Sequence, residues 1–162
     1  MDLAELLMFE HAVIRVRSEH IGIEGPFFED MNRFVLKWHA SIEDEVLFPL
    51  LQEHFSGKPE IVSDINRIAA DHKLIQTLGE NLEKWKKEGN SKLFNERIGL
   101  YVRLIREHND KEEESIFHLW KEIPEAARKE TMSRAIKALK SGVLDWYTVY
   151  TGLSPRMLDY IQ

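Results

Sequence analysis

The sequence predicts an all-α fold, an up-down-up-down antiparallel four-helix bundle with a C-terminal helical extension. Three observations support this prediction. Turn-forming residues recur at regular intervals, the apolar residues between them are spaced by three and four, and the alternation typical of β-strands is missing. The chain of 162 residues is long enough for one domain with its own core. We assign the bundle to residues 1–122 and the extension to residues 123–162.

Four breaks divide the chain into five helical segments. They are Gly25-Pro26, Ser56-Gly57-Lys58-Pro59, Gly89-Asn90-Ser91 and Ile123-Pro124. In three breaks a proline falls in the first turn of the next helix, where its missing N–H costs no hydrogen bond, and Ser91 can cap the fourth segment. We therefore expect helices at 2–20, 26–54, 59–88, 91–121 and 124–140. Pro49 should bend the far end of the second helix.

An apolar stripe marks the first four segments. Its members are, in order, Leu3, Leu7 and Ile14; Phe28, Val35, Ile42, Val46 and Leu50; Ile61, Ile65, Ile68, Ile75, Leu82 and Trp85; and Phe94, Ile98, Tyr101, Ile105 and Leu119. Because each helix has one apolar face, the four can bury these faces against each other in a bundle.

One histidine interrupts the stripe of each bundle helix, and in the second and fourth helices a glutamate follows four residues later, on the same face. These six residues are His11, His39, Glu43, His72, His108 and Glu112. Residue counts from the shared turns, at ~1.5 Å per residue, place all four histidines near one level of an antiparallel bundle. A lone core histidine is usually just hydrogen-bonded. Burying six polar groups in one layer would lower the stability of the fold by ~1–3 kcal/mol for each unsatisfied group. Bound cations would satisfy all six, so we predict a metal site.

The chain also repeats itself. Residues 39–48 match residues 108–117, and Glu10-His11-Ala-Val-Ile matches Asp71-His72-Lys-Leu-Ile. The repeat predicts two half-sites, each with two histidines and one carboxylate, which suits two adjacent cations bridged by the glutamates. Glu10 and Asp71 are candidates for hydrogen bonds that orient the histidines, and solvated acids on a helix face are the alternative.

Composition limits the metal chemistry and the partners. The chain has no cysteine, so any metal must be held by nitrogen and oxygen. A net charge of -6 argues against a nucleic-acid partner or an anionic membrane surface, since both require clustered basic residues. No apolar run approaches the ~20 residues of a membrane span, and the first residues lack the basic flank of a signal peptide. We expect a soluble cytoplasmic protein.

With this combined motif, residues 1–121 resemble the hemerythrin-like family, also called the HHE cation-binding domain. The family signature is a histidine, a His-x-x-x-Glu, another histidine and a second His-x-x-x-Glu on four successive helices. The resemblance implies that the four histidines are terminal ligands of a non-haem di-iron centre and that Glu43 and Glu112 are its bridging carboxylates. The implied cofactor is two iron ions, with zinc or another divalent cation as the alternative.

Two departures from the oxygen-carrying hemerythrins refine this expectation. Those carriers have a further histidine four residues after the third-helix histidine, where this chain has Gln76, a candidate for a role next to the ligands. Their fourth-helix carboxylate is an aspartate five residues after the histidine, whereas Glu112 follows the pattern of relatives implicated in iron sensing, nitric-oxide response and iron–sulfur repair. His20 could supply the missing nitrogen, but it points to the opposite side of an ideal helix from His11.

The resemblance therefore favours a non-enzymatic iron protein that binds or senses dioxygen, nitric oxide or iron itself. A di-iron oxidase or peroxidase and an iron–sulfur cluster repair protein are the enzymatic alternatives. A structural bundle that holds zinc or no metal is the third.

The C-terminal extension lies outside the resemblance. It contains an amphipathic segment followed by an aromatic run, with the apolar residues Met132, Ala135, Ile136, Leu139, Trp146, Tyr147, Val149 and Tyr150. Such a segment is too apolar for a free tail. We expect it to pack on the bundle, and a homodimer or partner interface is the alternative.

Overall fold

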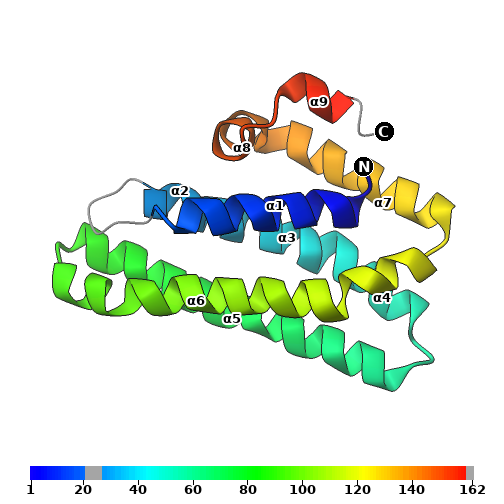
Figure 1. Ribbon diagram of the computed structural model, residues 1–162, viewed down its shortest axis with the longest axis horizontal. Coiled ribbons are helices and arrows are strands. Elements are labelled where there is room, and N and C mark those ends of the chain that lie inside the picture. Colours follow the sequence, from blue (N-terminus) through cyan, green and yellow to red (C-terminus); the bar gives the residue numbers. More distant parts are fainter. Residues whose placement is uncertain (21–26, 160–162) are drawn as a thin grey trace.

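The computed structural model describes residues 1–20 and 27–159, and this part of the chain is helical without a strand. Four long helices run alternately up and down and form the predicted bundle (Figure 1). The first is α1 (Leu3–Ser18), which begins at Asp2 with a reciprocal side-chain cap to Glu5. The predicted break at Gly25-Pro26 and the predicted start of the second helix at residue 26 lie outside the described residues.

The second helix contains two π-helical turns. It comprises α2 (Phe27–Phe34), a π turn at Val35–His39, α3 (Ala40–Ile42), a π turn at Glu43–Leu47 and α4 (Phe48–His54). Pro49 lies in the first turn of α4 and has no N–H for the carbonyl of Glu45, so regular α-helical bonding cannot pass through this point. π turns are rare and often occur at functional sites. Here His39 ends the first turn and Glu43 begins the second.

The third and fourth bundle helices are α5 (Pro59–Lys87) and α6 (Ser91–Ser115). Between them Gly89 adopts a φ of 69°, which favours glycine. The cap of α6 is Asn90, whose side chain accepts a hydrogen bond from the backbone of Leu93, rather than the predicted Ser91.

The fourth helix ends six residues before its predicted end at residue 121. A 3-10 helix at Phe117–Glu122 follows Ser115. Its three residues per turn align side chains spaced by three, and this spacing buries Phe117 and Trp120 together. The α-helical prediction for 116–121 was wrong because tertiary packing of these aromatic rings overrode the regular helical spacing.

The core of the bundle is mostly apolar, with one layer of polar side chains near its middle. Tyr101, which belongs to the predicted apolar stripe, is fully buried and donates its hydroxyl hydrogen bond to Asn32 at 2.6 Å. The buried polar layer contains Glu10, His11, His39, Glu43, His72, His108, Asn109 and Glu112. Buried charged groups are rare unless they are paired or bind metals, so this layer is the candidate functional site.

The C-terminal extension packs on the α1 side of the bundle, away from α5 and α6 (Figure 1). It consists of α7 (Glu125–Gly142), α8 (Leu144–Thr151) and α9 (Pro155–Asp159). α7 contacts α1, and α8, which the sequence did not predict as a separate helix, contacts α2. Tyr147 and Tyr150, one turn apart, face inward from α8, and Gly152 ends this helix with a φ of 75°.

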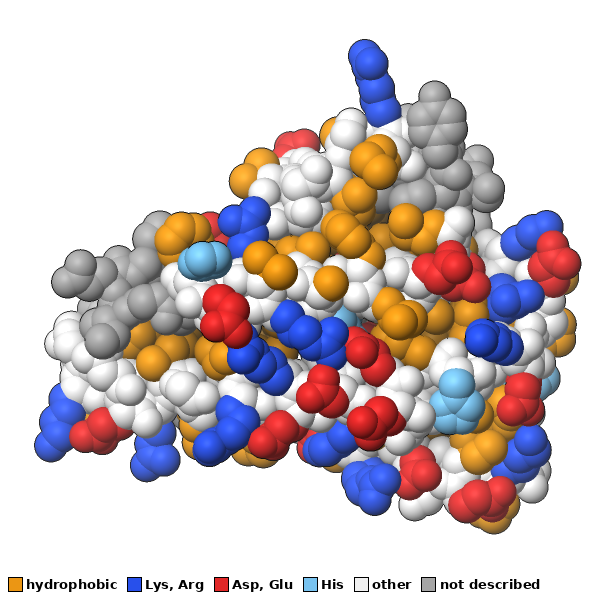
Figure 2. Space-filling view, in the orientation of Figure 1, with side chains coloured by type: hydrophobic (Ala, Val, Ile, Leu, Met, Phe, Trp, Pro, Cys, Tyr) orange, Lys and Arg blue, Asp and Glu red, His pale blue; other side chains and the backbone are white. Residues whose placement is uncertain are grey.

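The face of the molecule drawn in Figure 2 carries two kinds of surface. Figure 2 shows acidic and basic side chains interspersed over α6, whereas apolar side chains gather over α1 and toward the extension. None of the helices in the described ranges is both long enough and apolar enough to cross a membrane.

Candidate metal centre

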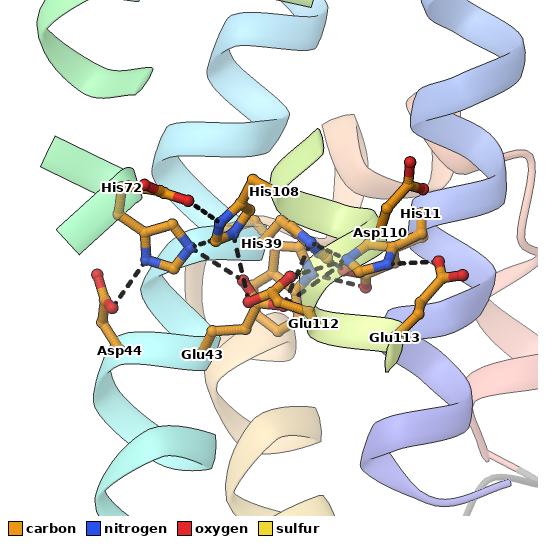
Figure 3. A network of polar contacts seen from close by, with 12 residues as sticks. His11, His39, Glu43, Asp44, His72, His108, Asp110, Glu112 and Glu113 are labelled. Atoms are coloured by element: carbon orange, nitrogen blue, oxygen red, sulfur yellow. Dashed lines mark hydrogen bonds and ion pairs between the residues drawn. The ribbon is translucent and has the colours of Figure 1, made fainter. Parts of the chain in front are cut away.

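The six residues predicted to bind metal meet in one layer of the bundle (Figure 3). His11 comes from α1 and His72 from α5. The second bundle helix supplies the pair His39 and Glu43, and α6 supplies the pair His108 and Glu112. All six side chains are buried, and both glutamates are completely inaccessible to solvent. The six side chains were predicted to lie at one level along the bundle, and the four helices bring them together at that level.

The cluster divides into two groups of four possible ligands. We call His11, His39, Glu43 and Glu112 position one, and His72, His108, Glu43 and Glu112 position two. Within each group the ligand atoms lie within 4.8 Å of one another. The Nε2 atoms of His11 and His39 are 3.0 Å apart, and those of His72 and His108 are 2.8 Å apart. The two imidazoles of each group thus direct the same nitrogen toward a common point.

Each glutamate belongs to both positions through different oxygens. Glu43 Oε1 lies 3.3 Å from His39 Nε2, and Glu43 Oε2 lies 3.4 Å from His72 Nε2. Glu112 Oε2 lies 3.2 Å from His11 Nε2, and Glu112 Oε1 lies 3.3 Å from His108 Nε2. One carboxylate oxygen is therefore available to each position, which is the arrangement that a bridging carboxylate requires.

The four carboxylate oxygens of Glu43 and Glu112 are buried and have no hydrogen-bond partner. A buried carboxylate without a partner is costly, and native structures normally satisfy such groups with a hydrogen bond, a counter-charge or a metal. Imidazole nitrogens and carboxylate oxygens are good ligands for first-row transition metals. The residues therefore fit a pair of divalent cations.

Acidic side chains surround the outer nitrogens of the histidines. His11 Nδ1 donates to Glu113 Oε1, His39 Nδ1 to Glu10 Oε2 and His72 Nδ1 to Asp44 Oδ1, each at 2.8 Å. The fourth, His108 Nδ1, lies 3.7 Å from Asp71 Oδ2 and makes no hydrogen bond. A proton held at Nδ1 leaves the Nε2 lone pair free for a cation, and a carboxylate partner also increases the basicity of the imidazole.

A comparison with protein-family models supports the metal-binding interpretation. Residues 3–120 match the model of the hemerythrin HHE cation-binding domain. The chain belongs to this family. Neither the curated proteins nor the solved structures gave a significant match. Membership in the family, together with the buried His/Glu cluster, indicates a cation-binding protein.

Without a cation, the carboxylates of this HHE domain favour protonation of two of its histidines, His11 and His72. Burial opposes protonation of His11, but Glu112, Glu113 and Glu43 outweigh it and raise the pKa of His11 to about 9. Burial also lowers the pKa of His72. Asp44 and Glu43 outweigh this effect and raise the pKa of His72 to about 10.

The pKa values of Glu112 and Glu113 shift in the opposite direction. Burial raises the pKa of Glu112, but His108 and His11 outweigh it and hold that pKa far below its usual range. The hydrogen bond from His11 is the main reason why the pKa of Glu113 falls to about 2. The cluster thus carries negative charge that either protons or cations must compensate.

Two outer carboxylates were predicted and two were missed. Glu10 is fully buried, so for this residue the alternative of a solvated acid is wrong, and Asp71 lies beside His108. The missed pair, Asp44 and Glu113, directly follow the two bridging candidates in sequence. The internal repeat contained this signal, because both copies place an acid at that position.

The other candidates lie outside the cluster. Gln76 is exposed, donates to Glu80 at 2.7 Å and lines a surface groove together with Leu36 and Ser41. The structure gives no support to its predicted role next to the ligands, because the Gln76 side chain itself faces solvent. His20 is also exposed.

Proposed function

We propose that the protein binds two iron ions in a non-haem di-iron centre and uses it to bind or sense dioxygen, nitric oxide or iron itself. The observation that carries this proposal is the position of Glu43 and Glu112, each with one oxygen toward either pair of histidines. Position one and position two would each offer two imidazoles and two carboxylate oxygens. Mixed nitrogen and oxygen ligands of this kind suit iron, and zinc is the main competitor.

Four protein donors per ion are fewer than the six that octahedral coordination uses, which leaves room for water or a small ligand. Two ferrous ions can supply electrons to a bound diatomic molecule. The chain's own contribution is to fix the donors and to limit water. Phe117 stacks on His11 with ring centroids 5.2 Å apart, and Phe48 stacks on His72 at 5.7 Å. These rings are buried and cover both ends of the cluster with apolar surface.

Reversible oxygenation distinguishes binding or sensing from enzymatic turnover. Protein loaded with ferrous iron without oxygen should change its visible absorbance when dioxygen or nitric oxide is added, and the change should reverse when the gas is removed. Irreversible oxidation with multiple turnovers of a reductant would instead support a di-iron oxidase or peroxidase. If neither gas alters the spectrum of the iron-loaded protein, the proposed gas binding is wrong and iron sensing remains.

A further inference from the structure

The two cation positions share both glutamates but differ in the side chains behind their histidines. At position one, both histidines donate hydrogen bonds to glutamates, Glu113 and Glu10. At position two, one of the two histidines has such a bond, to Asp44, which is 46% exposed. Outer partners of this kind commonly change metal affinity by about 10- to 100-fold.

Glu10 is the most constrained of the four outer carboxylates. It is fully buried and accepts three hydrogen bonds, from Trp38 Nε1 at 2.9 Å, from Tyr147 OH at 2.8 Å and from His39 Nδ1. Tyr147 is itself inaccessible to solvent and packs edge-on against Trp38, with ring centroids 5.5 Å apart. Its hydroxyl therefore fixes one oxygen of Glu10 and leaves the other for His39.

The counterpart of Glu10 in the second half of the repeat is held differently. Asp71 is 29% exposed and accepts from Lys111 at 2.7 Å, on the solvent side of the bundle. The counterpart of Trp38 is Glu107, which is exposed. Tyr147 comes from α8 of the extension, which lies on the side of the bundle formed by α1 and the second helix (Figure 1). The pseudo-symmetry of the ligands is thus broken by a segment outside the repeat.

We propose that Tyr147 is a positioning residue that acts through Glu10 and His39 to make position one the tighter of two unequal cation sites. Position two then holds the exchangeable cation. This inference rests on the proposed two-cation centre and adds a difference between its positions. It also gives the C-terminal extension a function, since α8 completes the surroundings of one cation site.

Stepwise release of cobalt(II) tests the inference without relying on iron or on activity. Protein loaded with two cobalt ions is mixed with excess chelator, and the loss of the cobalt absorption is followed over time. We expect two phases of equal amplitude whose rates differ by about tenfold or more. Tyr147→Phe should accelerate the slow phase by about three- to tenfold, leave the fast phase unchanged and shift the absorption bands of the slowly released ion.

Tyr150→Phe is the matched control. It removes a buried hydroxyl from the same helix, but that hydroxyl makes no hydrogen bond. Tyr150→Phe should therefore release cobalt in both phases at the rates of the unaltered protein. Single-position variants then assign the effect. Tyr147→Phe should accelerate release in the His72→Ala background, which keeps position one, and should have no effect in the His39→Ala background, which loses the contact to Glu10.

The outcomes separate the inference from the function on which it rests. Two ions released at one rate, or equal acceleration of both phases by Tyr147→Phe, would overturn the inference and leave the two-cation centre intact. An effect of Tyr150→Phe as large as that of Tyr147→Phe would reduce the role of α8 to general packing and would also overturn it. Failure of the unaltered protein to bind two cobalt ions would contradict the proposed centre itself.

Discussion

Replacing Glu43 with Ala is expected to lower the number of bound cations from two per chain to one or none. Both positions lose a carboxylate oxygen, because Glu43 Oε1 faces His39 and Glu43 Oε2 faces His72. Loss of a residue that bound a single ion would weaken one position, whereas loss of a shared residue weakens cation binding at both positions. Elemental analysis of the purified variant, combined with its protein concentration, measures the loss. Glu112→Ala should give the same result for the same reason.

Glu45→Ala is the matched control for this experiment. It removes a carboxylate two residues away in the same π turn, but Glu45 is exposed. It should retain two ions. Glu43→Gln, which keeps the size of the side chain, should lose cations as Glu43→Ala does and should keep the helical circular dichroism signal. Two ions in the Glu43 or Glu112 variants would refute the bridging role.

Metal-free protein is expected to lose stability as the pH rises from 6.5 to about 10. The folded-state pKa values of His11 and His72 are raised from 6.5 to about 9 and about 10 by the surrounding carboxylates, against the effect of burial. Protonation of a group with a raised pKa stabilises the folded state. This contribution is complete below pH 6.5 and is lost as the pH passes through the folded-state values.

Denaturant titrations of chelator-treated protein at several pH values between 6 and 9.5 measure this loss. His11→Gln removes one of the two raised groups and should reduce the slope of stability against pH. Cation-loaded protein should lack the decline, because cations replace the protons and deprotonated imidazoles are the ligands. A metal-free protein whose stability is constant across this range would contradict the electrostatic account of the cluster.

The bundle and the inner cluster could be predicted because both depend on local periodicity. Helical spacing of apolar residues gave the four bundle helices, and the residue counts from the turns placed His11 and His39 at one height. Those counts need only the rise per residue and antiparallel order, which short connections impose. The two π turns could not be predicted by the same reasoning, since it assumes regular α-helical spacing throughout each helix.

The features of the site that the sequence analysis did not predict depend on tertiary packing. Gln76 was assigned to the surroundings of the site by analogy with a ligand four residues after His72, but its side chain faces solvent. Asp44 and Glu113 could have been found from the repeat. The bond from Tyr147 to Glu10 could not, because no periodicity relates a residue of the extension to one in α1, 137 positions earlier.

Metal identity and count in protein purified from iron-replete cells test the central claim most directly. We predict two iron ions per chain, since two buried groups of nitrogen and oxygen ligands share Glu43 and Glu112. Inductively coupled plasma mass spectrometry, normalised to amino-acid analysis, gives both numbers. Zinc alone, or no metal at all, would contradict the iron assignment, and one iron ion in fully loaded protein would contradict the paired centre.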